Sequence, residues 1–428
     1  MIRKKVRGRK FTILQGATLW VFNDGGIMTY SQITRGHKGI LAALTAALFF
    51  ILLNSGSPTP LYPLYKETFE LRNIDLTFIF SSYGFGVLLA LFLSRKLNIT
   101  GKNAKLILVA SLMVVVVPTL CFSFAGSLHA LCAFRFISGL GAGMVTAIIN
   151  TLLIKFSQGD SAKRAAQLGS LALVTGLALG PMISSVYSQL AFYPLASPSV
   201  TIATLVSLSA LAIVIFWPKH TPPSASAEGA KATENNDADF SKTRFYLLAL
   251  CVFISWSYAA LILSLGPTTA IDVFGLQSSA YFGYIATSYL LVAGVVQLTL
   301  PRFLKPEFSL ILGLIAQVFS MVIMTMALED GSVLSAAISL ALSGFSYGAV
   351  FVGGAILVNK MSLAAPDWHA VSKFYFIVYL FNATPLAAGW LADKMGVFSA
   401  LLASIFLFMA IYAVFSVLAL WLLLLRKA

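Results

Sequence analysis

Charged residues are scarce in this chain, and their scarcity argues against a soluble protein. Only 10% of its 428 residues are Asp, Glu, Lys or Arg, whereas soluble globular domains carry about a quarter. Hydrophobic residues make up 59%, and the mean hydropathy is +0.89. Because so few charges cannot cover a surface that faces water, we expect lipid to be the solvent of this protein.

Cysteine and the common catalytic motifs are also rare or missing. Cys121, Cys132 and Cys251 all lie in apolar stretches without CxxC spacing, so we expect buried small side chains and no metal or redox site. The sequence contains no GxxxxGK[ST] phosphate loop, no GxSxG elbow and no HExxH pair. We therefore predict that the chain is not an enzyme, has no catalytic residues and needs no cofactor.

Acidic residues are the rarer charged group, with 15 Asp and Glu against 29 Lys and Arg. All the acidic residues fall in tails, in loops or at the ends of apolar stretches, so no carboxylate is expected near the middle of the membrane. Most basic residues lie at the N-terminus and in alternate gaps between apolar stretches. That distribution is typical of membrane topology and not of a phosphate-binding face. It predicts cytoplasmic termini and no nucleic acid partner.

About twelve apolar stretches are long enough to cross a bilayer, which takes about 20 residues each. We place them at 39–60, 75–94, 105–125, 129–154, 166–190, 197–217, 245–267, 279–300, 308–328, 333–358, 370–392 and 397–424. The fold class is therefore an all-α membrane protein with two six-helix bundles. The expected parts are a cytoplasmic N-terminal tail (1–38), a first half (39–217), a cytoplasmic linker (218–244) and a second half (245–428).

The two sets of spans share sequence features at a nearly constant offset of about 205 residues, which is typical of parallel repeats in transporters. Ser138-Gly139 recurs as Ser343-Gly344, and Ser82-Tyr83 recurs as Ser288-Tyr289. Each match is weak alone, but they follow one another in the same order. Two copies of one membrane unit generally place a working site where the copies face each other, so the pattern favours transport.

Arg135 is a basic residue that lies well inside an apolar span. Burying a guanidinium there costs roughly 2.5–3.5 kcal/mol on insertion scales, so the side chain needs a polar cavity or partners. One interpretation is that Arg135 lines a cavity between the halves and contacts the substrate or helps to move protons. The other is a structural residue that donates to backbone carbonyls. The sequence leaves both open.

Glycines follow Arg135 on the same predicted helix, and their spacing allows a neighbouring helix to approach closely. In the fifth span, a proline next to glycine predicts a bend or ordinary tight packing. We assign helix packing and gating to Gly139, Gly141, Gly143, Gly176, Gly180, Pro181, Gly344 and Gly348.

These residues resemble motifs of the major facilitator superfamily of secondary transporters, and the resemblance extends from about Gly39 to the C-terminus. The segment from Arg135 to Gly143 matches the fourth-helix pattern RxxxGxGxG. Gly176-xxx-Gly180-Pro181 matches the core of GxxxGPxxGG, which implies an exporter of the proton-antiporter type, although Ser184-Ser185 replace its last two glycines.

One loop pattern of the family is eroded in this chain. The pattern GxLaDRxGR(K/R), expected between spans two and three, survives without its acidic residue, which in the family helps to latch the halves. A closer copy, Gly389 to Gly396 with Asp393 as its acid, lies at the end of span eleven.

Uncharged polar and aromatic side chains inside the spans are candidates for lining a substrate cavity. Such a set suits an amphipathic or weakly charged ligand, although a single Asn in a span often bonds only a neighbouring helix. Together with Arg135, the substrate or coupling candidates are Asn54, Tyr83, Asn150, Trp256, Tyr258, Tyr289 and Asn382.

The resemblance implies a secondary active transporter that exports a small organic compound, such as a drug-like molecule, a metabolite or a siderophore, across the bacterial inner membrane. Alternating access and antiport with protons are expected, with membrane lipid around a monomer. If protons couple, Arg135 with an acid such as Glu67 or Asp75 is the candidate relay. Uptake of a nutrient by symport or facilitated diffusion is the alternative. A membrane-embedded enzyme or a transporter-like sensor is the alternative from another class.

Overall fold

The computed structural model describes residues 2–6, 9–13, 20–23, 26–94, 103–156, 160–218, 241–365 and 368–424. Within these ranges, twelve helical segments are long and apolar enough to cross a membrane, which confirms the predicted number. The first half contains α1 (Tyr30–Gly56), η1 (Thr59–Leu61), α2 (Tyr62–Phe69), α3 (Asn73–Ser94), α4 (Ala104–Phe122), α5 (Leu128–Phe156), α6 (Asp160–Gln189) and α7 (Ser197–Phe216). The second half contains α8 (Lys242–Asp272), α9 (Ala280–Thr299), η3 (Leu300–Arg302), α10 (Pro306–Asp330), α11 (Val333–Ala364), α12 (Ala370–Tyr379), η5 (Leu380–Ala383), α13 (Thr384–Met395) and α14 (Val397–Leu423).

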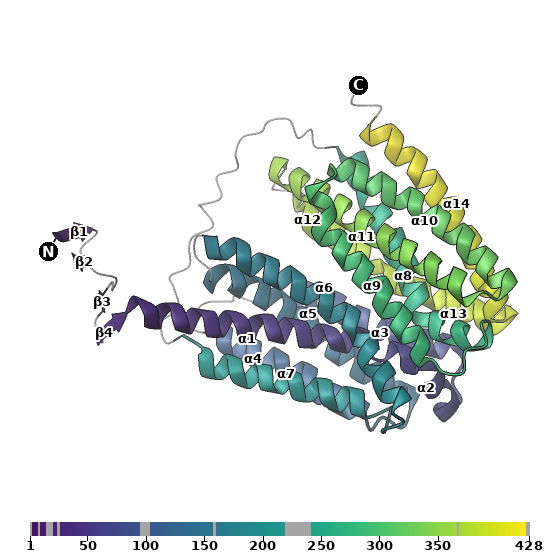
Figure 1. Ribbon diagram of the computed structural model, residues 1–428, viewed down its shortest axis with the longest axis horizontal. Helices are drawn as coiled ribbons and strands as arrows, with labels where there is room; N and C mark the ends of the chain where they lie inside the picture. The colour runs from purple at the N-terminus through teal and green to yellow at the C-terminus, as the bar shows by residue number, and fades with distance from the viewer. Residues whose placement is uncertain are drawn as a thin grey trace.

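Two short hairpins precede α1. Strand β1 (Ile2–Val6) pairs antiparallel with β2 (Arg9–Ile13), and β3 (Trp20–Asn23) pairs antiparallel with β4 (Gly26–Thr29). Figure 1 shows them beyond the end of α1, away from the helical bundles. These strands and the first turns of α1 lie in the segment that we assigned to the N-terminal tail. Most of the predicted linker, residues 219–240, lies outside the described residues.

The two halves form separate bundles that lie side by side (Figure 1). The purple to teal helices α1–α7 make one bundle, and the green to yellow helices α8–α14 make the other. Each bundle has its own buried apolar core. Across the boundary, α6 packs along α9, and α3 packs along α13.

The glycines of the sequence repeat occupy matching positions in the two bundles. A Cβ at Gly139 of α5 would overlap the carbonyl oxygen of Tyr83 in α3, and a Cβ at Gly344 of α11 would overlap the carbonyl oxygen of Tyr289 in α9. Small residues at these points let the backbones touch without side chains between them. The same repeated residue pairs therefore make the same helix contact twice.

Two of the spans are broken, and prolines mark both breaks. In the first span, α1 ends at Gly56, and the chain continues through η1 into α2. Pro60 lies near the start of η1. In the eleventh span, α12 ends at Tyr379 and is followed by η5. The α-helix then resumes as α13, with Pro385 in its first turn. Proline lacks an N–H and cannot continue the ladder of helical hydrogen bonds. We predicted both spans without interruption, so these breaks are corrections.

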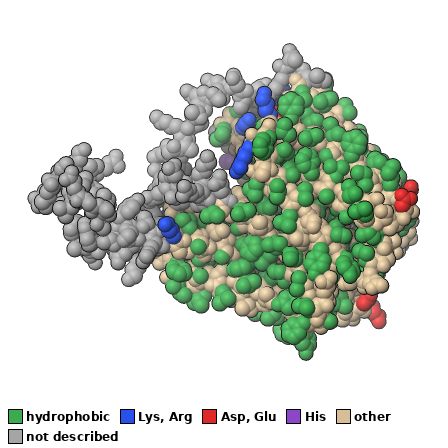
Figure 2. Space-filling view, in the orientation of Figure 1, with side chains coloured by type: hydrophobic (Ala, Val, Ile, Leu, Met, Phe, Trp, Pro, Cys, Tyr) green, Lys and Arg blue, Asp and Glu red, His purple; other side chains and the backbone are tan. Residues whose placement is uncertain are grey.

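Hydrophobic side chains cover the face shown in Figure 2, while its Lys, Arg, Asp and Glu side chains lie toward the margins. Basic and acidic groups gather at different margins of this view. Large apolar residues are exposed along the outward faces of the helices, for example Leu407 and Val417 of α14. An apolar belt of this kind is stable only when lipid covers it.

Candidate functional site

A cavity of about 230 Å³ lies between the two bundles. The first bundle contributes residues of α1, η1, α3, α5 and α6, and the second contributes residues of α8, α9, α11, α12 and η5. Four of the eight predicted substrate or coupling residues line it, namely Arg135, Tyr83, Trp256 and Asn382. These four come from four separate spans of both halves, so the fold brings together side chains that are far apart in the chain.

Arg135 combines the two interpretations that the sequence left open. Its side chain lines the cavity but is 3% exposed. Nη1 donates to the carbonyl oxygen of Asn54 at 3.0 Å, and Nη2 donates to that of Ser55 at 2.9 Å. These carbonyls belong to the last turn of α1, where helical carbonyls lack partners within the helix. Arg135 therefore caps α1 and at the same time places a positive charge at the cavity wall.

Tyr83 packs against this guanidinium. Cζ of Arg135 lies 4.4 Å from the centre of the Tyr83 ring, which is within cation–π range. Tyr83 is positioned by α3, whose backbone is held against α5 by the contact with Gly139. The close helix contact thus places the ring and the guanidinium next to each other.

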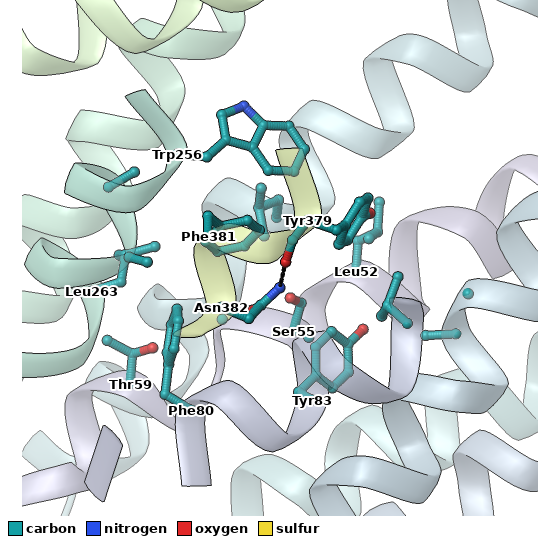
Figure 3. A pocket seen from close by; sticks show the side chains of 18 of the residues that line it. Leu52, Ser55, Thr59, Phe80, Tyr83, Trp256, Leu263, Tyr379, Phe381 and Asn382 are labelled. Atoms are coloured by element: carbon teal, nitrogen blue, oxygen red, sulfur yellow. Dashed lines mark hydrogen bonds between the residues drawn. The ribbon is translucent and has the colours of Figure 1, made fainter. Parts of the chain in front are cut away.

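An aromatic cluster forms the part of the wall that the second bundle contributes. Trp256 of α8 lies with its ring centre 5.6 Å from that of Tyr379, 5.3 Å from that of Phe381 and 6.2 Å from that of Tyr347. Figure 3 shows Trp256, Phe381 and Tyr379 around the same space as Tyr83. Such rings offer flat apolar contact surfaces for a ligand.

Asn382 lies in the break of the eleventh span. Its Nδ2 donates to the carbonyl oxygen of Tyr379 at 2.8 Å, as the dashed line in Figure 3 shows. Its Oδ1 lies against Gly84 of α3, where a Cβ would overlap it. The broken helix thus places an amide of the second half directly against the backbone of the first.

The other four predicted residues do not line this cavity. Asn54 is buried beside it, and its Nδ2 donates to Thr119 Oγ1 at 3.0 Å, which joins α1 to α4. Tyr289 is buried behind Tyr347, with ring centres 6.0 Å apart. Tyr258 lines a smaller apolar cavity within the second half, and Asn150 is exposed near the end of α5. Composition alone does not separate Asn382 from Asn54 or Asn150.

The glycine positions divide by the neighbour that they contact. Gly139 and Gly143 face α3, whereas Gly141 faces α4, because residues two apart lie on opposite sides of a helix. Gly344 and Gly348 both face α9. Helix α5 is therefore in close contact with a neighbour on each side.

Gly176, Gly180 and Pro181 of α6 pack against α1. A Cβ at Gly176 would lie 2.5 Å from the carbonyl oxygen of Phe49, and one at Gly180 would lie 2.5 Å from that of Leu53. Next to them, Ser184 Oγ and Ser57 Oγ share a hydrogen bond of 2.8 Å. The Gly176–Pro181 motif therefore makes its close contact within the first half, between α6 and the end of α1.

Several lining residues were not predicted from the sequence. Ser55, Thr59, Phe80 and Phe381 line the cavity but were not selected. Ser55 and Thr59 flank the break of the first span, and Phe381 lies in the break of the eleventh. A stronger weight on prolines inside predicted spans would have identified these two regions.

At one end of the molecule, polar side chains join the two bundles; we call this the closed end. Asp393 of α13 accepts hydrogen bonds from the backbone N–H groups of Asn73 at 2.8 Å and Ile74 at 3.1 Å. Tyr284 donates to Gln189 at 2.8 Å, and Lys66 pairs with Asp272 at 3.9 Å. These residues lie at the connections after the first, fifth, seventh and eleventh spans or at the span ends beside them.

The opposite end has a different contact between the bundles. Phe92 of α3 and Phe376 of α12 meet edge to face with ring centres 5.5 Å apart.

The charged pairs at the closed end do not include Arg135. In the described ranges, Asp75 pairs with Arg72 at 3.1 Å, and Glu67 is exposed. The acids suggested as relay partners thus lie at the closed end, away from the Arg135 hydrogen bonds.

Two solved structures have a similar fold. A bacterial homologue of the human lysosomal transporter Spinster, in an inward-facing and occupied conformation, aligns with a TM-score of 0.67 at 14% identity, covering 89% of this chain and 96% of that chain. The nucleoside transporter NupG aligns with a TM-score of 0.67 at 14% identity, covering 89% of this chain and 98% of that one. These likenesses show the twelve-helix fold.

Sequence comparison adds the family. A multi-drug resistance efflux pump PmrA homolog of Lactococcus lactis subsp. lactis (strain IL1403) is 25% identical over 176 residues, which are 40% of this chain. The match spans 43% of that relative's length. The sequence profile of the Major Facilitator Superfamily matches residues 44–371. With twelve spans, a cavity between two bundles and this match over most of its length, the chain belongs to the Major Facilitator Superfamily and is a multi-pass membrane protein.

Proposed function

We propose that this transporter exports a small organic compound across the bacterial cytoplasmic membrane by alternating access, driven by protons. The observation that carries the proposal is the cavity itself. Its wall is shared by both bundles, and Arg135, Tyr83, Trp256 and Asn382 face one space. When the bundles rock, such a cavity changes the side on which it opens.

The polar contacts at the closed end support a two-state movement. They join the bundles beside the connections that follow odd-numbered spans, and these connections face outward if the N-terminus is cytoplasmic. The excess of Lys and Arg in the alternate connections supports that orientation and cytoplasmic termini. The described state is then closed to the outside. Opening it requires the Asp393 hydrogen bonds to break.

The proposed direction of transport is export. The efflux pump homologue that matches part of the chain supports export, as does the Gly176–Pro181 motif. The same motif supports proton antiport, although every carboxylate lies in a tail, in a loop or at a span end. This placement of the acids favours facilitated diffusion as the second candidate function.

Everted membrane vesicles test direction and coupling together. An imposed gradient, acidic inside, is followed with a pH-sensitive dye while organic compounds are added one at a time. Export by antiport predicts that at least one compound accumulates inside, collapses the gradient faster than in vesicles without the protein, and loses accumulation when an uncoupler is present. Equilibration that the uncoupler leaves unchanged would support facilitated diffusion instead.

A further inference from the structure

The charge of the cavity wall is positive. Among the described residues that line the cavity, Arg135 is the only charged one, and the other polar side-chain groups are hydroxyls, the Asn382 amide and the Trp256 indole N–H. A ligand that enters this space thus meets a guanidinium without a carboxylate beside it. In a site of low dielectric constant, such a charge discriminates strongly between ligands of opposite sign.

The partners of Arg135 leave its charge largely uncompensated. Its two described hydrogen bonds go to the backbone carbonyls of Asn54 and Ser55. The end of a helix carries about half a negative charge, so capping α1 offsets only part of the charge of the guanidinium. In addition, Nε of Arg135 is buried with no hydrogen-bond partner among the described residues. No hydrogen bond to this nitrogen therefore offsets the remaining charge.

The rest of the wall is aromatic and flat. Trp256 stacks toward Tyr347 with an interplanar angle of 29°, and Tyr379 and Phe381 meet it edge to face. Phe80 and Tyr83 lie across the same space from Trp256 in Figure 3. Rings on both sides favour a planar aromatic ligand, which gains offset-stacked and edge-to-face contacts.

We propose that the cavity binds planar aromatic anions, with a carboxylate or similar acidic group toward Arg135 and the ring between Phe80 and the Trp256 cluster. This inference rests on the proposed function, because it takes the cavity as the transport site. It predicts that lipophilic cations bind poorly.

Three probes that share the naphthalene ring and differ in charge test the proposal directly: 2-naphthoate, 2-naphthamide and trimethyl(2-naphthyl)ammonium. Binding to the purified full-length chain in lipid nanodiscs is measured by titration calorimetry. We expect 2-naphthoate to bind about tenfold or more tightly than the cation, with the amide between them. Equal or tighter binding of the cation would overturn the charge assignment, and no binding of any probe would overturn the aromatic one.

Two variants test whether the probes bind in this cavity, and both keep Arg135, which caps α1. Asn382→Asp places a carboxylate in the cavity and should weaken 2-naphthoate binding by about tenfold while strengthening cation binding. Its control is Asn359→Asp, which adds the same charge at an exposed position of α11. Trp256→Leu should weaken all three probes, whereas Trp390→Leu, at an exposed tryptophan of α13, should not. Equal effects of a variant and its control would contradict the site.

The proposed ligand class and the proposed proton-coupled export can be disproved independently of each other. Nanodisc titration needs no gradient, so the preference for the anion is measurable even if the vesicles show no proton coupling. In that case the proposed export would be overturned while the ligand class stands. Conversely, proton-coupled export of a cationic dye with no binding of 2-naphthoate would overturn the ligand class alone.

Discussion

Asp393 caps the first turn of α3 from the other half of the molecule. Its carboxylate accepts three hydrogen bonds from Asn73 and Ile74: two from the backbone N–H groups, at 2.8 and 3.1 Å, and one from Asn73 Nδ2 at 2.9 Å. An anion at a helix N-terminus satisfies unpaired N–H groups and the positive end of the helix dipole. The acid of the family-like Gly389 to Gly396 segment thus fastens the two bundles at the closed end.

Asp393→Asn should open the closed end more often. Asparagine keeps one acceptor oxygen but loses the negative charge and the second acceptor. Losing one such hydrogen bond costs about 1 kcal/mol, so the ratio of open to closed molecules should rise roughly fivefold. Spin labels at the exposed positions Phe192 and Gln277, one on each bundle, report the distance between the halves there. The three native cysteines are first replaced by serine. Asp330→Asn removes an exposed acid from another connection and serves as control; an equal shift in both variants would refute the capping role.

Asp272→Asn should have a much smaller effect on the same distance. The Asp272–Lys66 pair is 3.9 Å long and partly exposed, with side-chain exposures of 45% and 31%. Exposed ion pairs contribute about 0–1 kcal/mol because solvent screens them and ordering two side chains costs entropy. If this variant opened the closed end as strongly as Asp393→Asn, charge pairing and not helix capping would hold the halves together.

Gly139→Ala and Gly344→Ala should each destabilise the protein. The added methyl group would overlap the carbonyl oxygen of Tyr83 or of Tyr289, which the backbone cannot move aside easily. Overpacking of this kind costs about 1–3 kcal/mol, and thermal unfolding in detergent should show a lower melting temperature. Gly126→Ala is the control, because a Cβ there has no neighbour within 4 Å. Unchanged melting in the two helix variants would contradict the close contacts.

Arg135→Ala should abolish transport while the protein still inserts in the membrane. The variant removes the positive charge from the cavity and leaves the last carbonyls of α1 without their donor. The everted-vesicle assay measures the loss, and the yield of protein in the membrane fraction measures insertion. Arg302→Ala, at an exposed position of η3, should transport normally. Normal transport by Arg135→Ala would remove this residue from the mechanism.

Much of the fold follows from the sequence because lipid imposes simple rules. Each span must be apolar and about 20 residues long, so twelve stretches were identified from composition. The repeat also had structural meaning, since Gly139 and Gly344 make the same contact with Tyr83 and Tyr289. The breaks at η1 and η5 were not predicted, because span length and hydropathy take no account of the prolines that mark them.

The site was predicted only in part for a related reason. Asn54, Asn150 and Asn382 look equivalent in sequence, yet only Asn382 lines the cavity, since its place depends on how the two bundles meet. The capping role of Asp393 likewise depends on a contact across 320 residues. Hydropathy and local motifs describe single helices and not the surfaces between bundles.

The most direct test of the account compares both ends of the molecule in one experiment. Distances are measured in nanodiscs between labels at Phe192 and Gln277, and separately between labels at the exposed residues Leu106 and Phe303 beyond the opposite end. Rocking of two bundles around the Arg135 cavity predicts that Asp393→Asn lengthens the first distance and shortens the second. If both distances lengthen together, or if neither changes, alternating access about this cavity is contradicted.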